Sequence, residues 1–190
     1  DDDDNGSRSH DDDDDNGGSC NRSHDDDDDN GRYSSHDDDD DNGPSPNPST
    51  ITFTSTLLPA NEVPPVSNAE ASGSGTMTMI MRIQRDSAQN ITSATGDFTV
   101  TLTGFPATIA VTAAHIHPGA AGQTGPPQID LGISAGQVTL NNGSGSFTRN
   151  GIAIGAADAQ SIINTPGNWY FNVHSVANGG GFARGQLVRQ

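Results

Sequence analysis

Lysine is absent from this 190-residue chain, and cysteine and tryptophan each occur once. The eight arginines are scattered, so the basic stripe that binds a phosphate backbone is missing and we expect no nucleic-acid partner. No apolar run approaches the roughly 18 residues of a membrane-spanning helix. The lone Cys20 cannot form an intrachain disulfide, so cysteine usage does not indicate whether the protein resides in an oxidising or a reducing compartment. Because the chain begins inside a repeat unit, we interpret it as part of a longer, secreted precursor.

Acidic residues are concentrated at the start of the chain. Residues 1–49 hold 19 aspartates and 3 arginines, whereas residues 50–190 hold 6 acids and 5 arginines. Four aspartate runs, at 1–6, 11–17, 25–31 and 37–43, each end in Asn-Gly, and a proline-rich stretch follows. We therefore divide the chain into Asp-rich DDDDDNG repeats at 1–43, a semi-rigid linker at 44–49 and a domain at 50–190.

Each aspartate run contains the spacing D-x-D-x-N-G, which is the first half of a calcium loop. The bidentate glutamate that closes an EF-hand is missing, but the next run begins 10 to 14 residues later and offers a substitute. The alternative is a disordered acidic brush. His10, His24 and His36 precede the runs and are interpreted as bystanders among hard carboxylates. The expected calcium ligands are Asp1, Asp3, Asn5, Asp12, Asp14, Asn16, Asp26, Asp28, Asn30, Asp38, Asp40 and Asn42.

Short stretches of alternating β-branched residues, cut by Gly, Pro and Asn, fill the domain and predict an all-β fold. Eight strands are expected, enough for an antiparallel β-sandwich of the immunoglobulin-like or superoxide-dismutase-like kind. Met77, Met79, Met81 and Ile83 share one face of a strand and predict core. A short helix or turn is expected near Asp158. The predicted strands are 50–58, 75–84, 91–102, 111–117, 136–140, 145–149, 169–176 and 182–188.

Three phrases of the domain resemble the chordin-type, or CHRD, domain. LPANEVPPV at 58–66 is similar to that family's opening L-x-G-x-x-E-V-P-P-V, and AHIHPGAA at 114–121 to its A-H-I-H-x-G-x-A centre. WYFNVHS at 169–175 with GGFARGQL at 180–187 resembles its Y-V-N-V-H-T and G-G-E-I-R-G-Q-L ending. Phe182 departs from the family's glutamate, so a contact made by that glutamate would be lost here. The resemblance implies a β-rich extracellular module without an established catalytic activity.

His115 and His117 lie two residues apart on a predicted strand and so point to the same face, with His174 on another strand. Two interpretations remain open. In the preferred one, these histidines and Asn172 form a buried hydrogen-bond cluster with Glu62 or Arg184. In the other, the three histidines begin a copper or zinc site like that of superoxide dismutase.

The expected function is that of a non-enzymatic extracellular structural or adhesive protein, such as a filament or matrix subunit, with calcium-binding repeats. Expected partners are further copies of the chain, the extracellular matrix or cell-surface components. The alternatives are a copper or zinc oxidoreductase and a calcium-dependent ligand-binding module. The secreted or cell-surface location agrees with four N-glycosylation triplets, at Asn5, Asn21, Asn90 and Asn142.

Overall fold

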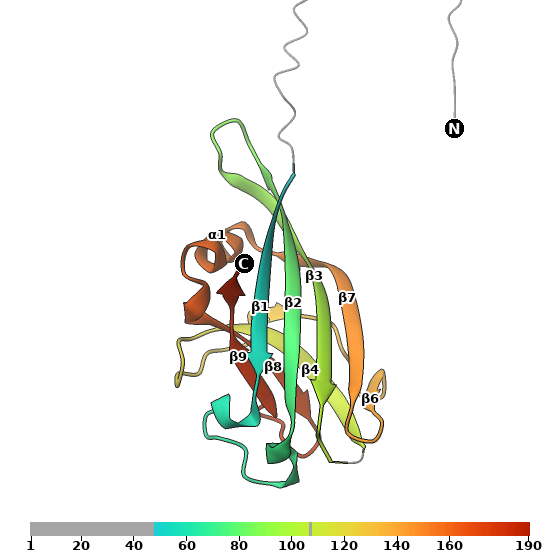
Figure 1. Ribbon diagram of the computed structural model, residues 1–190. Coiled ribbons are helices and arrows are strands. Elements are labelled where there is room, and N and C mark those ends of the chain that lie inside the picture. Colours follow the sequence, from blue (N-terminus) through green and yellow to red (C-terminus); the bar gives the residue numbers. More distant parts are fainter. Residues whose placement is uncertain (1–47, 107) are drawn as a thin grey trace, which may run out of the picture. The chain divides into compact units, whose positions relative to one another are not determined.

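The computed structural model describes residues 48–106 and 108–190, which form two antiparallel β-sheets packed face to face (Figure 1). The expected all-β sandwich is confirmed. The expectations for the aspartate repeats, for the calcium ligands and for Asn5 and Asn21 lie outside the described residues.

The first sheet has the strand order β10-β1-β2-β3-β7. Its members are β1 (Ser49–Leu57), β2 (Ser74–Arg85), β3 (Ile91–Thr103), β7 (Gly145–Ile154) and β10 (Val188–Arg189). β1, β2 and β3 pair over nearly their whole lengths, with Phe53, Met79 and Phe98 in one register. These long strands form the broad wall at the front of Figure 1.

The second sheet is built around β4 (Ile109–Pro118), which pairs with β8 (Trp169–Ser175) along one edge. Two short strands, β5 (Ile129–Asp130) and β6 (Val138–Leu140), also pair with β4. β9 (Ala183–Gln186) continues the sheet beyond β8. Strands β4 and β8, which lie far apart in the sequence, thereby become neighbours in one sheet.

The core lies between the sheets and follows the period of two that the sequence shows. Met77, Met79, Met81 and Ile83 are fully buried, as the alternation in β2 predicts. On the opposite sheet Ile116, Phe171 and Val173 face them and are equally buried. Burial of apolar side chains from both inner faces is the main source of stability in such a sandwich.

Helical segments join the strands. α1 (Ala156–Asn164) lies between β7 and β8, near the expected position at Asp158, and buries Ala159 and Ile162. Three short 3-10 helices are η1 (Pro59–Asn61), η2 (Ala69–Ser72) and η3 (Pro166–Asn168).

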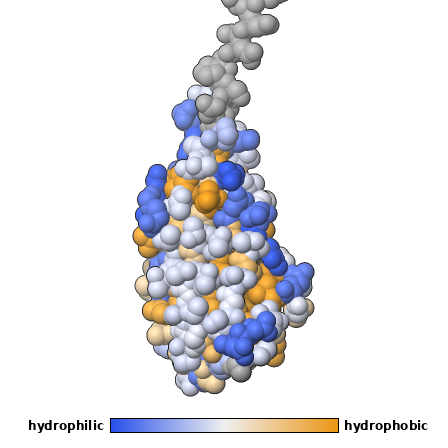
Figure 2. Space-filling model, turned by 45° about the vertical axis from the view of Figure 1, so that its right-hand side comes forward, coloured by the Kyte–Doolittle hydropathy of each residue, from blue (hydrophilic) through white to orange (hydrophobic). Residues whose placement is uncertain are grey.

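The outer face of the first sheet is rich in threonine. In one register row Thr54, Thr78, Thr99 and Thr148 are neighbours on consecutive strands, and the next row is Thr56, Thr76, Thr101 and Ser146. Figure 2 shows this side of the molecule as largely pale, neither strongly hydrophilic nor strongly hydrophobic. β-Branched side chains favour the pleated backbone, and their hydroxyls keep the solvated face polar.

Two details of the strand prediction are wrong. The stretch 182–188 is not one strand, because the chain leaves the second sheet after β9 and enters the first as β10. Leu187, at the crossing, donates its backbone N–H to Trp169 O and buries its side chain. β5 was not expected, since two residues carry no periodic pattern.

Candidate metal centre

The outer face of the second sheet is polar but covered by loops. Because side chains alternate along a strand, His115 and His117 on β4 share this face with Tyr170, Asn172 and His174 on β8. All seven residues of β8 are buried. Three segments fold over the face: 59–66 after β1, 119–128 after β4, and 176–181 after β8. In a two-layer sandwich one face of a strand is usually exposed to solvent, but both faces of β8 are buried.

The three histidines meet on this covered face. One ring nitrogen from each lies within 4.8 Å of the others. His115 Nδ1 is 3.0 Å from His174 Nε2, and the rings of His115 and His117 meet edge to face at 5.5 Å. Nitrogens that share a tetrahedral zinc ion lie roughly 3.3 Å apart, since each bond is about 2.0 Å long. One pair is close to that spacing at 3.0 Å, and the widest separation, up to 4.8 Å, exceeds it by about 1.5 Å.

Two of the imidazoles are oriented by a hydrogen-bond acceptor at their other nitrogen, and the third has a carboxylate nearby. His117 Nδ1 lies 3.1 Å from Gly125 O, and His174 Nδ1 lies 3.0 Å from Gly179 O. His115 Nε2 lies 3.5 Å from an Asp130 carboxylate oxygen. Gly125 O and Gly179 O thus leave Nε2 of His117 and of His174 on the side of the cluster, where His174 Nε2 shares a 3.0 Å contact with His115 Nδ1. Acceptors behind the ligand rings are the usual outer shell of a histidine metal site.

His117 Nε2 is buried and has no hydrogen-bond partner. A buried acceptor without a partner costs roughly 1–3 kcal/mol, so its orientation toward two other imidazoles calls for a ligand. A divalent transition metal accepts that lone pair directly, and imidazole is a preferred ligand of both zinc and copper. The residues present therefore fit such an ion.

Burial keeps these histidines in the neutral form that binds metal. Desolvation lowers the pKa of His117 to about 4 and lowers the pKa of His174 as well. Burial also lowers the pKa of His115, with Asp130 acting in the opposite direction. His115 is the most exposed of the three, with its side chain 16% accessible. Of the three histidines, His115 therefore lies nearest to solvent.

Tyr170 and Arg184 close the cluster on the β9 side. The Tyr170 ring stacks on His117 at 4.8 Å with an angle of 2° between the planes, and the Arg184 guanidinium lies 3.5 Å from the Tyr170 ring centre. Arg184 is only 1% exposed and donates to the backbone carbonyls of Ala120 and Gln123. Arg184 therefore fastens the 119–128 segment over His117.

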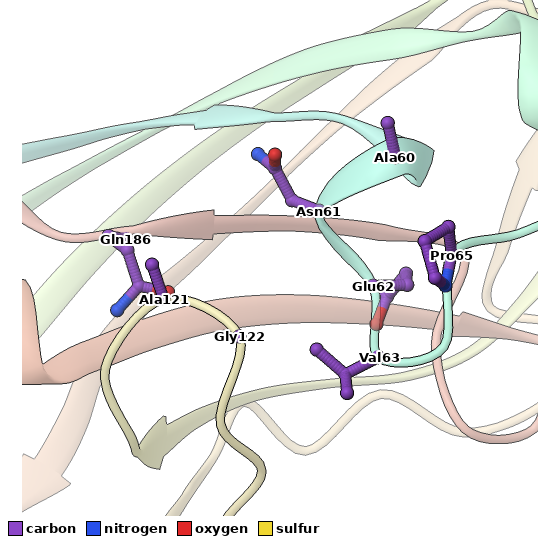
Figure 3. A pocket seen from close by; sticks show the side chains of 8 residues that line it. All are labelled: Ala60, Asn61, Glu62, Val63, Pro65, Ala121, Gly122 and Gln186. Atoms are coloured by element: carbon purple, nitrogen blue, oxygen red, sulfur yellow. The ribbon is translucent and has the colours of Figure 1, made fainter.

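Glu62 lies on the same face but does not touch the histidines by any hydrogen bond among the described residues. It accepts from Asn172 Nδ2 at 3.4 Å, and burial raises the pKa of its carboxyl to about 7 against the opposing charge of Arg184. A pocket of about 410 Å³ opens beside it, between the 59–66 segment, Gln186 of β9 and the loop at Ala121 (Figure 3). A second pocket of about 260 Å³ lies on its other side.

The structure thus separates the polar residues that the sequence grouped together. His115, His117 and His174 form one cluster, whereas Glu62 joins Asn172 and Arg184 joins Tyr170. Asp130 and the carbonyls of Gly125 and Gly179 were not anticipated. Asp130 is a weak signal on its own, although it is an acid near the H-x-H phrase. Backbone carbonyls carry no residue-type signal at all.

The remaining predicted positions can also be located. Phe182 is fully buried and meets Phe105 edge to face at 5.0 Å, so an apolar contact occupies the position of the family's glutamate. Asn90 and Asn142 are exposed in turns. Asn90 Nδ2 donates to Asp86 at 3.0 Å.

The two layers and the covered polar face define the class as an all-β sandwich module. The CHRD domain profile matches residues 53–187, and the chain belongs to this family. CHRD domains occur in extracellular proteins. No curated protein and no solved structure matches the chain. Among the described residues, no helix has the length and apolarity that crossing a membrane requires.

Proposed function

We propose that this domain is a metal-binding, non-enzymatic extracellular module, with zinc or copper held by His115, His117 and His174. The observation that carries the proposal is the convergence of three imidazole nitrogens within 4.8 Å. The proposal replaces the simple hydrogen-bond cluster as the preferred interpretation. A cluster held only by hydrogen bonds would leave the buried His117 Nε2 without a partner.

Three protein ligands leave one coordination position for water or an outside ligand, as zinc sites with three histidines do. The partial exposure of His115 supports access from that side. The ion would connect β4 to β8 and, through Gly125 and Gly179, two of the covering loops. The expected consequence is a stiffer binding face rather than a new fold.

The first test is metal analysis of the full chain after chelation, dialysis and reloading with zinc or copper. We expect one tightly held ion per chain. A His115→Ala, His117→Ala, His174→Ala variant should lose that ion. The matched control changes the three tail histidines, His10, His24 and His36, to alanine and should retain it.

Cobalt substitution supplies a second readout, because its visible spectrum reports the coordination number and the nitrogen ligands. A tetrahedral spectrum that disappears in the sandwich variant and persists in the tail variant supports the site. If the tail variant loses the ion instead, or the wild-type chain holds none, the proposed metal centre is wrong.

A non-catalytic role is proposed because the resemblance to the CHRD family implies no established reaction. Metal-loaded chain should therefore show no more superoxide dismutation than the free ion. Activity that requires His117 would overturn this part of the proposal and favour the oxidoreductase alternative.

The structural or adhesive role remains a proposal as well, with self-association and calcium binding by the aspartate repeats. The D-x-D-x-N-G spacing supports the calcium part. For self-association, the described sandwich offers β7, an edge strand of the first sheet that pairs only with β3 there. Unpaired backbone groups along such an edge can accept a strand from another chain.

A further inference from the structure

Two buried oxygen atoms on the covered face have no hydrogen-bond donor. Glu62 is 6% exposed and Asn172 3% exposed, yet Glu62 Oε1 and Asn172 Oδ1 have no hydrogen-bond partner. Both atoms lie within 2.6 Å of the point where a Cβ on Gly181 would sit, which limits their separation to about 5 Å. A side chain at position 181 would collide with them.

The orientation of the Asn172 amide is set by its other contacts. Its Nδ2 donates to Gly180 O at 3.1 Å and to Glu62 Oε2 at 3.4 Å. Turning the amide over would place its oxygen against the Gly180 carbonyl, so the amide oxygen stays beside Glu62 Oε1. Two acceptors in a dry site repel each other unless one carries a hydrogen.

We infer that Glu62 is a neutral carboxylic acid that donates its O–H to Asn172 Oδ1, closing a two-hydrogen-bond ring between the carboxyl and the amide. The proton pairs both orphan oxygens at once. The ring fastens the 59–66 segment to β8 and, through Gly180, to the 176–181 loop. This inference is independent of the metal centre.

The charges around Glu62 are compatible with a neutral acid. Arg184 on β9 acts against it, but the guanidinium is committed to Tyr170 and to the carbonyls of the 119–128 segment. The other titratable groups on the neighbouring elements are His115, His117, Tyr170 and His174 on β4 and β8, and Glu70 on η2. Glu70 accepts from Ser175 and Asn178, away from the ring. Burial, the dominant influence, raises the pKa of Glu62 to about 7.

Ionisation of Glu62 would therefore act on a defined part of the molecule. The pocket of about 260 Å³ is lined on one side by the Glu62–Asn68 stretch and on the other by Asn178, Gly180 and Gly181. The ring connects these two sides. Loss of the proton leaves a carboxylate against an amide oxygen, and the two sides separate. The pocket is thus gated by protons near neutral pH.

The chain has only two glutamates, Glu62 and Glu70, which makes the test direct. Carbon-13 labelling of glutamate in the metal-free full chain gives two side-chain carboxyl signals, and a Glu70→Gln variant assigns them. We expect the Glu62 signal to move between the neutral and ionised positions over about pH 6 to 8. A Glu62 signal that stays at the ionised position down to pH 5 overturns the inference.

Amide hydrogen exchange tests the gate. After correction for the intrinsic pH dependence of exchange, protection of Gly180 and Gly181 should fall at least severalfold from pH 6 to pH 8 in the wild-type chain. Glu62→Gln keeps a donor at the same position and should hold the protection constant, whereas Glu62→Ala should lose it at both pH values. Equal behaviour of the Gln and Ala variants would contradict the proposal. A metal chelator is added to every sample, so the result of this test does not depend on whether the histidines bind a metal.

Discussion

The buried nitrogen-bearing side chains on the covered face of this sandwich bond to backbone carbonyls. His117, His174 and Arg184 each place a ring or guanidinium nitrogen near a carbonyl of a covering loop. Unlike an opposite charge, a carbonyl leaves the net charge of the site unchanged, so the neutral histidines remain available as ligands. The two buried glutamates accept from side chains instead, Glu62 from Asn172 and Glu70 from Ser175 and Asn178.

The buried acid makes a prediction about stability. The pKa of Glu62 is about 7 in the folded chain against an ordinary value of 4.5, so the folded state binds the proton more tightly. Stability from this group is complete below pH 4.5, falls as the pH rises to 7, and is constant above that. The loss should be of the order of 3 kcal/mol. Glu62→Gln should not show it.

Urea unfolding of the two metal-free proteins at pH 5 and pH 8 measures this difference. The histidines titrate in both proteins, so their contribution cancels when the two stabilities are subtracted at each pH. A wild-type minus Gln difference that is the same at both pH values would show that Glu62 is ionised throughout.

At the scale of elements, β2 is the strand whose sequence and environment agree most closely. It lies between β1 and β3, with Met79 against Phe53 and Phe98, and its side chains alternate between core and solvent. Flexible methionines fill the space between aromatic rings of both neighbours. The length of β2 and the alternation of its side chains therefore predicted both the strand and its buried face.

Two neighbouring substitutions in β2 should differ sharply in effect. Met79→Ala removes a fully buried side chain and should destabilise the domain by about 2–5 kcal/mol. Ile80→Thr, on the solvent face where Ile80 is 38% exposed, should change stability by no more than about 0.5 kcal/mol. Thermal unfolding compares both with wild type. Similar costs for the two would mean that β2 does not separate core from solvent as described.

The whole molecule combines a nearly neutral domain with a highly acidic tract. Net charge is -17 for the chain, and nearly all of it comes from residues 1–49. Adjacent carboxylates at that density repel one another unless cations neutralise them, and three arginines cannot do so. The proposed ligands of the two parts therefore differ in kind. Carboxylates suit calcium, whereas imidazoles suit a softer transition metal.

Calcium binding by the tract is tested on the full chain by titration calorimetry at 0.15 M salt. Wild type should bind several ions, and a variant with Asp12, Asp14, Asp26 and Asp28 changed to asparagine should bind fewer. Circular dichroism and electron microscopy of the same samples report ordering and self-association. If wild type binds none, the tract is an acidic brush and the calcium proposal fails.

The sequence by itself determined the sandwich, most of its strands and the family, because alternation with a period of two is local and the three CHRD phrases are contiguous. It also placed His115 and His117 on one face, since residues two apart on a strand share a side. The division of 182–188 between two sheets and the burial of Phe182 were decided by packing.

Only the tertiary structure decided how the polar residues are grouped. His174 meets His115 across 59 residues of sequence, and Glu62 meets Asn172 across 110. The first contact follows from the pairing of β4 with β8, whereas the second depends on a segment that covers the outer face of the second sheet. Neither long-range strand pairing nor loop packing has a periodic signal in the sequence. The loops remove water from that face, which is why its histidines are neutral and its glutamate holds a proton.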